Sequence, residues 1–371
     1  MANRDEFEIF LMCPPGLEEA LYDEVRAHRF RAAKKAAGGV TVRGDWKDAW
    51  RANLELRGTG RVMAEIGRFR TPTLPELERR ARNVDWVRVL RRDVPVRVEA
   101  TCRKSKIYHT GAAEQRVADA IREELGAPVS DDADVCVRVR IENDICHLGI
   151  DTSGDLLHKR GFKEAVNKAP MRETMAALFL RQCGYRGAEP VVDPMCGSGT
   201  FVIEAAEIAA GLKPGRERRF AFEHLAGFDA DVWQRMKLAS AAVSPPVRFQ
   251  GSDRDAGAIA MSRANAERAG VAAFCDFRQH AVSDLEPPSG PPGLVIVNPP
   301  YGKRIGDTKS PLPLYRALGA VLLQKFSGWR VGLVTNEKFL ADATGLPFLP
   351  PAAPVAHGGI RVTLYQTAAL P

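Results

Sequence analysis

The sequence predicts an α/β protein in which a mostly parallel β-sheet, covered by helices on both faces, forms the carboxyl-terminal half and smaller α+β units precede it. The first observation is the regular alternation of apolar, strand-like runs with helical stretches after residue 183, which is typical of βαβ units. The second is the run 294–297, four apolar residues that follow Gly293 and end just before Asn298 and two prolines. A run this short and continuous indicates a strand buried on both faces, as in parallel sheets.

The composition is that of a globular protein with two or three domains. The chain has 371 residues, 45% of them hydrophobic and 27% charged, and Lys and Arg outnumber Asp and Glu by 53 to 46. The excess is concentrated in residues 61–116, which contain 14 Lys or Arg and 7 Asp or Glu. This basic segment predicts either a surface for an anionic partner or a solvated arginine-rich face.

Several features argue against other classes of protein. The seven cysteines form no C-x-x-C pair and have no histidine at metal-ligand spacing, so we expect neither a disulfide framework nor a metal site. Residues 1–13 lack the basic and apolar pattern of a signal peptide, and no run approaches the roughly 18 apolar residues of a membrane span. We therefore expect a soluble, cytoplasmic protein without a membrane partner.

The amino-terminal part is predicted to form two α+β units. Apolar spacing and turn residues indicate strands at 7–12, 39–43, 61–66 and 94–101, two strands within 134–151, and helices at 17–28, 46–54, 74–83 and 113–125. We place one domain at residues 1–60 and a second at 61–155. A linker at 156–178 then leads into the sheet domain at 179–371.

The loop after the strand at 94–101 has the composition of a nucleic-acid contact. It combines cations, a hydroxyl and a ring just before a helix, which suits phosphate contacts, although a solvated loop would have a similar composition. The order of strand, Lys-Ser-Lys-Ile-Tyr-His-Thr, helix and hairpin resembles a THUMP domain, an RNA-binding module, preceded by a ferredoxin-like unit. The resemblance implies RNA contacts from Arg103, Lys104, Ser105, Lys106, Tyr108 and His109.

A glycine loop follows the first strand of the sheet domain. It lacks the Gly-Lys-Ser/Thr of a phosphate-binding P-loop, and Val202 stands where the dinucleotide fingerprint has glycine. Asp193 at the strand end would repel a pyrophosphate but would pair with an ammonium group. S-adenosylmethionine (SAM) has such a group, so we expect it to bind at Asp193, Pro194, Met195, Cys196, Gly197, Ser198, Gly199 and Thr200.

Two further strand ends carry polar residues. The strand at 247–252 leads into Ser252, Asp253 and Arg254, and a carboxylate there can accept the ribose hydroxyls, although Asp253 or Asp255 could instead cap the next helix. The strand at 294–297 ends at Asn298 because neither Pro299 nor Pro300 can donate to a β-ladder. A plain Asn-Pro turn is the alternative for that motif.

Asp193–Ala206, Gly251–Gly270 and Val297–Gly302 resemble motifs of class I SAM-dependent methyltransferases, whose sheet is Rossmann-like. With the THUMP-like part in front, the chain resembles bacterial RNA guanine-N2 methyltransferases, with ribosomal RNA favoured over transfer RNA as the partner. The resemblance implies that catalysis rests on Asn298, Pro299, Pro300 and Tyr301. Tyr301 would stack on the base, and Lys303 and Arg304 would contact flanking phosphates or remain surface cations.

One motif departs from the family. The third strand tip often carries an acid that holds the adenine amine, whereas this chain has Gln279, His280 and Ala281. His280 or a backbone amide at Ala281 would then hold the adenine. Other readings are a DNA adenine-N6 or protein glutamine methyltransferase, since the Asn298 motif suits any planar amine, and an RNA-binding protein with a vestigial pocket.

Overall fold

The computed structural model describes residues 6–163, 171–239, 242–300 and 310–371. The chain forms two compact units. Unit 1 contains residues 1–13, 25–157 and 215–239, and unit 2 contains residues 14–24, 158–214 and 240–371.

Unit 1 is built on a seven-stranded sheet with the order β2-β3-β1-β4-β7-β6-β5. All neighbouring strands are antiparallel except β5 and β6, which are parallel. β4 is long enough to pair with β1 at one end and β7 at the other, so it joins the two halves of the sheet. The strands are β1 (Phe7–Met12), β2 (Lys34–Ala36), β3 (Gly39–Gly44), β4 (Arg61–Arg70), β5 (Val96–Arg103), β6 (Val135–Glu142) and β7 (Ile145–Asp151).

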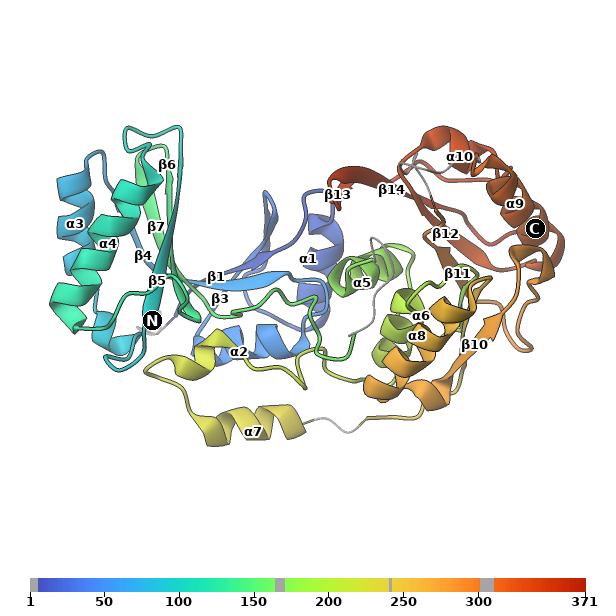
Figure 1. Cartoon of the computed structure of the whole chain (residues 1–371), viewed down its shortest axis with the longest axis horizontal. Helices are drawn as coiled ribbons and strands as arrows, with labels where there is room; N and C mark the ends of the chain where they lie inside the picture. Colours follow the sequence, from blue (N-terminus) through green and yellow to red (C-terminus); the bar gives the residue numbers. More distant parts are fainter. Residues whose placement is uncertain (1–5, 164–170, 240–241, 301–309) are drawn as a thin grey trace. The chain divides into compact units, whose positions relative to one another are not determined.

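The helices of the amino-terminal part confirm the predicted order of elements. They are α1 (Glu18–Ala27), α2 (Trp46–Glu55), α3 (Leu74–Arg82) and α4 (Thr110–Leu125), and α3 and α4 lie side by side next to the strands β4–β7 (Figure 1). Helix α4 was predicted to begin at Ala113, three residues after its actual first residue, Thr110. Ala113 is its first buried residue and the turn before it is exposed, so apolar spacing missed that turn.

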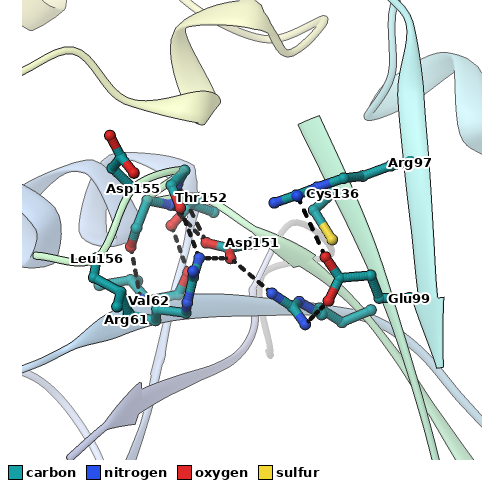
Figure 2. Close-up of polar contacts among 12 residues, drawn as sticks. Arg61, Val62, Arg97, Glu99, Cys136, Asp151, Thr152, Asp155 and Leu156 are labelled. Atoms are coloured by element: carbon teal, nitrogen blue, oxygen red, sulfur yellow. Dashed lines mark hydrogen bonds and ion pairs between the residues drawn. The ribbon is translucent and has the colours of Figure 1, made fainter. Parts of the chain in front are cut away.

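Ion pairs around one buried carboxylate connect strands β4 to β7 of this sheet (Figure 2). The Asp151 carboxylate, with none of its side chain exposed, is ion-paired with Arg61, and Arg138 lies 3.7 Å from it. Arg138 also pairs with Glu99 on β5, which lies 3.4 Å from Arg97. Because a buried carboxylate is stable only when its hydrogen bonds and charge are satisfied, this network holds β4, β5, β6 and β7 together.

Residues 215–239, from the carboxyl-terminal half of the sequence, belong to unit 1. They contain the 3-10 helix η2 (Ala221–His224) and helix α7 (Ala230–Leu238). Phe222 stacks on Trp50 of α2 at a ring separation of 5.6 Å and meets Trp233 edge-on at 5.0 Å. These apolar rings explain why the segment groups with unit 1 rather than with the sheet domain in which the sequence prediction placed it.

Unit 2 contains the predicted α/β sheet, with the order β10-β9-β8-β11-β12-β14-β13. The first five strands are parallel, while β14 is antiparallel to β12 and to β13, which confirms the α/β fold class. The strands are β8 (Val191–Asp193), β9 (Phe249–Asp253), β10 (Cys275–Gln279), β11 (Leu294–Val297), β12 (Arg330–Thr335), β13 (Val355–His357) and β14 (Ile360–Gln366).

Helices cover both faces of this sheet. They are α5 (Glu173–Gln182), α6 (Thr200–Ala209), α8 (Ala256–Arg268), α9 (Leu312–Lys325) and α10 (Lys338–Asp342). On β11, Val295 and Val297 share a buried cluster with α9 and α10. Ile296 of β11 points to the opposite face. A Cβ placed on Gly332 of the neighbouring strand would meet both Ile296 and Cys183, the residue directly after α5, so this face of the sheet lies toward α5. Both faces are therefore buried, as the apolar run predicted.

Within the described residues, no helix is both long enough and apolar enough to cross a bilayer. Those residues also contain no group of three or more His, Cys, Asp or Glu side chains arranged to hold a metal ion.

Candidate active site

A cavity of about 780 Å³ lies at the carboxyl ends of the parallel strands in unit 2. This is the edge of an open α/β sheet where ligands bind. Most of the residues predicted to bind SAM or to catalyse transfer line it: Asp193, Pro194, Met195, Cys196, Gly197, Ser198, Thr200, Asp253, Arg254, His280, Ala281, Asn298, Pro299 and Pro300. Segments more than 100 residues apart in the sequence are thus brought to one site.

Hydrogen bonds from the backbone of the glycine loop to the next strand and to a side chain of the next helix hold the loop in place. The Cys196 N–H donates to the Ser252 carbonyl at 2.9 Å, and the Ser262 hydroxyl of α8 donates to the Gly197 carbonyl at 2.9 Å. Gly197 and Gly199 have φ angles of +56° and +84°, which favour glycine. A Cβ at Gly197 would meet nothing within 4 Å, so a ligand can approach the backbone there.

Two predicted residues support the loop without lining the cavity. Gly199 forms the amino-terminal cap of α6, and a Cβ there would lie 3.1 Å from Ser262 and 3.2 Å from Ile203. Ser252 is 4% exposed, and its carbonyl anchors the Cys196 N–H. We therefore infer that both residues maintain the conformation of the glycine loop.

Asp193 is a buried carboxyl that lacks a cationic partner within the described part of the chain. It is 2% exposed and accepts one hydrogen bond, from the Met195 N–H at 3.1 Å. Burial raises the pKa of Asp193 to about 8, the Met195 N–H opposes this shift, and the charge of Asp253 adds to it. A cation bound beside Asp193 would stabilise its ionised form, so the site fits the ammonium group of a SAM-like ligand.

Asp253 and Asp255 have different roles at the end of β9. Asp255 caps α8 by accepting the Gly257 N–H at 2.9 Å, as the alternative prediction proposed for this residue. Asp253 instead accepts the Gly197 N–H at 3.1 Å and the Asp255 N–H at 3.0 Å. Its carboxylate is half-buried and lines the cavity, and the contact with ribose hydroxyls stays a prediction.

The end of β10 supplies the next part of the wall. The His280 N–H donates to the Asp253 carbonyl at 3.2 Å, and the His280 Nδ1 lies 3.0 Å from the Ala281 carbonyl oxygen. The 3-10 helix η4 (Val282–Asp284) follows and adds Val282 and Ser283 to the lining. An adenine ring could therefore lie between apolar and polar groups of this segment.

The amide of Asn298 projects from the end of β11. Its Oδ1 is buried and has no hydrogen-bond partner among the described residues. Pro299 is buried and Pro300 exposed, and both line the cavity. An acceptor kept free of protein partners is ready to receive an N–H from a substrate. Tyr301, Lys303 and Arg304 lie outside the described residues.

The predicted site omitted several polar residues of the cavity, among them Asn336 and His357. Asn336 follows β12 as Asn298 follows β11, so the rule that found Asn298 could have found it. His357 ends β13 and could not be found in this way, because only the antiparallel pairing of β14 with β12 and β13 brings it to this edge of the sheet.

Residues of the predicted linker, 156–178, brace the wall of the cavity. Arg160 and Glu204 of α6 form a buried ion pair at 3.1 Å. The Lys163 Nζ donates to the Thr200 hydroxyl at 2.8 Å and lies 3.2 Å from the carboxylate of Glu173. These contacts fix the amino-terminal ends of α5 and α6, next to the glycine loop.

The predicted RNA-binding loop lies in unit 1, between β5 and α4. The Lys106 N–H donates to the Asp144 carboxylate at 2.8 Å, and the Ser105 hydroxyl accepts the Asp144 N–H at 3.0 Å. Ser105 is therefore engaged in holding the loop against the β6–β7 turn. The Tyr108 ring, 71% exposed, lies 4.2 Å from the His109 ring.

The cations of this loop differ from those of α3. On α3, Arg79 lies 3.4 Å and Arg80 3.8 Å from the carboxylate of Glu76. Within the described residues, Arg103, Lys104 and Lys106 are exposed and lack an ion-paired carboxylate. The basic segment therefore combines the two predicted kinds of surface, a solvated helix face and a loop whose charges are free for an anionic partner.

Comparison with known families shows which class of protein this fold and cavity define. Residues 160–348 match the RMKL-like methyltransferase domain, and the chain belongs to that family. Residues 8–63 match the RlmL ferredoxin-like domain and residues 72–151 the THUMP domain. The resemblances to a ferredoxin-like unit, a THUMP domain and a methyltransferase domain are thereby confirmed.

Individual proteins are similar to this chain over most or all of its length. The ribosomal RNA large subunit methyltransferase K/L of Methylococcus capsulatus is 34% identical over 91% of this chain and 48% of its own length. The chain thus spans about half the length of the curated relatives it matches. The crystal structure of SMU.472 complexed with SAH has a TM-score of 0.88 and 26% identity over the whole of both chains. The crystal structure of a predicted N6-adenine-specific DNA methylase from Listeria monocytogenes has a TM-score of 0.89 and 30% sequence identity, and the match covers 98% of this chain and 96% of that one.

Proposed function

We propose that this protein is a SAM-dependent RNA methyltransferase that transfers a methyl group to the exocyclic N2 of a guanine, in 23S ribosomal RNA. The observation that carries the proposal is the buried Oδ1 of Asn298, which has no partner among the described residues, in the same cavity as the buried carboxyl of Asp193. One group is suited to an amine substrate and the other to a cationic methyl donor.

The donor half of the cavity fits SAM in charge and shape. Asp193 would pair with its ammonium group, Asp253 would accept ribose hydroxyls, and the segment at His280 and Ala281 would hold the adenine. The open space above Gly197 leaves room for the aminoacyl part. The similar structure of SMU.472 was determined with SAH, the product of methyl transfer from SAM.

The chemistry requires positioning more than a strong base. SAM, when bound, supplies an electrophilic methyl group. The Asn298 Oδ1 and the Pro299 carbonyl each accept one N–H of the guanine amine, which draws the nitrogen toward tetrahedral geometry and directs its lone pair. After transfer the nitrogen is acidic and loses its proton to solvent. Tyr301 would stack on the base.

The choice of RNA rests on the amino-terminal unit and on the relatives. A THUMP domain suits a phosphate backbone when its loop cations, as in the part of the chain that the structure describes, have no ion-paired carboxylate. The K/L relatives are named as methyltransferases of large-subunit ribosomal RNA, which favours 23S ribosomal RNA over transfer RNA. Such a substrate would place the reaction in the cytoplasm.

Nucleoside mass spectrometry after methylation in vitro tests the proposal. Purified protein and SAM would be incubated separately with 23S ribosomal RNA from a strain lacking the gene, with total transfer RNA and with duplex DNA. We expect N2-methylguanosine in the ribosomal RNA. The same product in transfer RNA alone would change the assigned substrate, while N6-methyladenine in DNA, or no methylation of any nucleic acid, would contradict the proposal.

The loop between β5 and α4 gives a separate prediction for RNA binding. Replacing Arg103 and Lys106 together with alanine should weaken RNA binding and lower the slope of log Kd against log salt concentration by roughly 0.7 for each lost phosphate contact. Arg79→Ala is the matched control, because Arg79 is already paired with Glu76. Equal effects of the two changes would show that the loop has no special role.

A further inference from the structure

The part of the cavity at β12 and the β13–β14 hairpin contains two polar groups that the proposed reaction does not use. The Asn336 Oδ1 is buried, and both ring nitrogens of His357 are buried, with no hydrogen-bond partner within the described residues. His357 is only 7% exposed, yet it lines the cavity. Because buried polar groups without partners are costly and rare, these atoms indicate a ligand that supplies the missing partners.

The sheet places these groups on the acceptor side of the cavity. Asp193 and Asp253 end β8 and β9 and His280 follows β10, whereas Asn298 and Asn336 follow β11 and β12. Val297 pairs with Leu333, so Asn336 stands further out along its strand than Asn298. β14 runs antiparallel to β12, and the turn after His357 therefore lies at the same edge.

The charge state of His357 suits hydrogen bonding to a neutral base. Burial lowers the pKa of His357, and the nearby positive charges of Arg172 and Lys163 lower it further. At neutral pH the ring is then uncharged and has one N–H donor and one acceptor nitrogen.

We propose that Asn336 and His357 select guanine, with the Asn336 oxygen accepting the base N1–H and the His357 N–H donating to O6. This inference rests on the proposed function. The amine N2, N1 and O6 follow one another along the edge of guanine. Asn298 and Asn336 directly follow β11 and β12, and His357 ends β13, which β14 separates from β12, so the three residues come in the same order across the sheet. At adenine, N1 is an acceptor and the 6-position a donor, so both contacts would be lost.

A substrate analogue separates selection of the base from transfer of the methyl group. 2,6-Diaminopurine keeps the 2-amino group but has an acceptor at N1 and an amine at position 6. A ribosomal RNA fragment that contains the methylated position would be synthesised with either guanine or 2,6-diaminopurine there. Sites built to hydrogen-bond a substrate reject analogues that lack the group, so the wild-type kcat/KM should be at least about a hundredfold lower for the analogue.

Two alanine variants then test whether Asn336 and His357 are the residues that select guanine. Asn336→Ala and His357→Ala should each lower kcat/KM for the guanine fragment roughly tenfold or more, should affect the analogue much less, and should leave the Kd for SAH unchanged. Thr363→Ala is the control, because Thr363 lies on the same hairpin but outside the cavity lining. Retained SAH binding shows that each variant is folded.

Each remaining outcome contradicts the inference in a distinguishable way. Wild-type enzyme that methylates both fragments equally, or variants that leave the preference for guanine intact, would exclude selection by Asn336 and His357 while the proposed function stands. A raised Kd for SAH with an unchanged preference would assign the residues to the donor side. If wild-type enzyme methylates neither fragment but does methylate adenine, the proposed function fails together with the inference.

Discussion

The donor and acceptor sides of the cavity differ in how their polar groups are satisfied. On the donor side, loop amides already occupy the carboxylates: Met195 donates to Asp193, and Gly197 donates to Asp253. On the acceptor side, the amide oxygens of Asn298 and Asn336 and the ring of His357 have no partner in the described residues.

This difference suggests that the two sides are prepared for different ligands. A carboxylate with one or two backbone donors is fixed in position yet keeps lone pairs for a cation or for hydroxyls. Amide oxygens that accept hydrogen bonds and a histidine ring that can donate one suit the edge of a base, which presents donors and acceptors in a fixed order. The donor side would thus be built for one cofactor, whereas the acceptor side decides which amine is methylated.

The largest effect that would separate the two sides is expected at Asn298. Asn298→Ala should lower kcat by about 10²–10³-fold, as for the loss of one preorganised hydrogen-bond partner of the transition state, without changing SAH affinity. Asn298→Asp keeps an acceptor oxygen and should retain more activity than the alanine variant. Full activity of Asn298→Ala in a radiolabelled methyl-transfer assay would remove the catalytic role.

A smaller effect, confined to binding, is expected at Asp193. Asp193→Asn should weaken SAH binding roughly tenfold to a hundredfold at pH 8.5, the cost of losing a charge-assisted hydrogen bond of about 1.5–3 kcal/mol. Titration calorimetry would measure the affinity. An unchanged Kd would show that the ammonium group binds elsewhere.

The pH dependence of the same binding follows from the raised pKa of Asp193, about 8 against an ordinary value of 3.8. Between these values the folded, free protein holds a proton that the unfolded chain has lost, so this group makes unfolding easier as pH rises. A cationic ligand favours the ionised form. SAH affinity should therefore rise from pH 6 toward pH 8 and then level off, and Asp193→Asn should lack this rise.

The smallest effect concerns the glycine loop. Gly199→Ala should destabilise the protein by about 1–2 kcal/mol for its left-handed backbone, with a further loss because the new Cβ would lie 3.1 Å from Ser262. Gly211→Ala is the matched control, since Gly211 also has a positive φ, +66°, but open space around it. Urea unfolding would compare them, and equal losses would contradict a role for the contact with Ser262.

The sequence by itself determined the features that depend on local pattern. The apolar run 294–297, the glycine loop after Asp193 and the polar residue after each strand predicted the sheet and most of the cavity lining, because strand ends are set by prolines and glycines close in sequence. The THUMP and methyltransferase resemblances came from equally local motifs. The individual roles of these residues and the domain boundaries remain predictions.

Only the tertiary structure decided the features that depend on long-range pairing. His357 reaches the cavity because β14 pairs antiparallel with β12, and residues 215–239 join unit 1 through the rings around Trp50. The arginines of α3 are ion-paired with Glu76, Glu78 and Glu123. Strand order and ion pairing bring together residues with no regular spacing in the sequence. The donor side of the cavity and Asn298 on the acceptor side could therefore be predicted from motifs, whereas His357 required the fold.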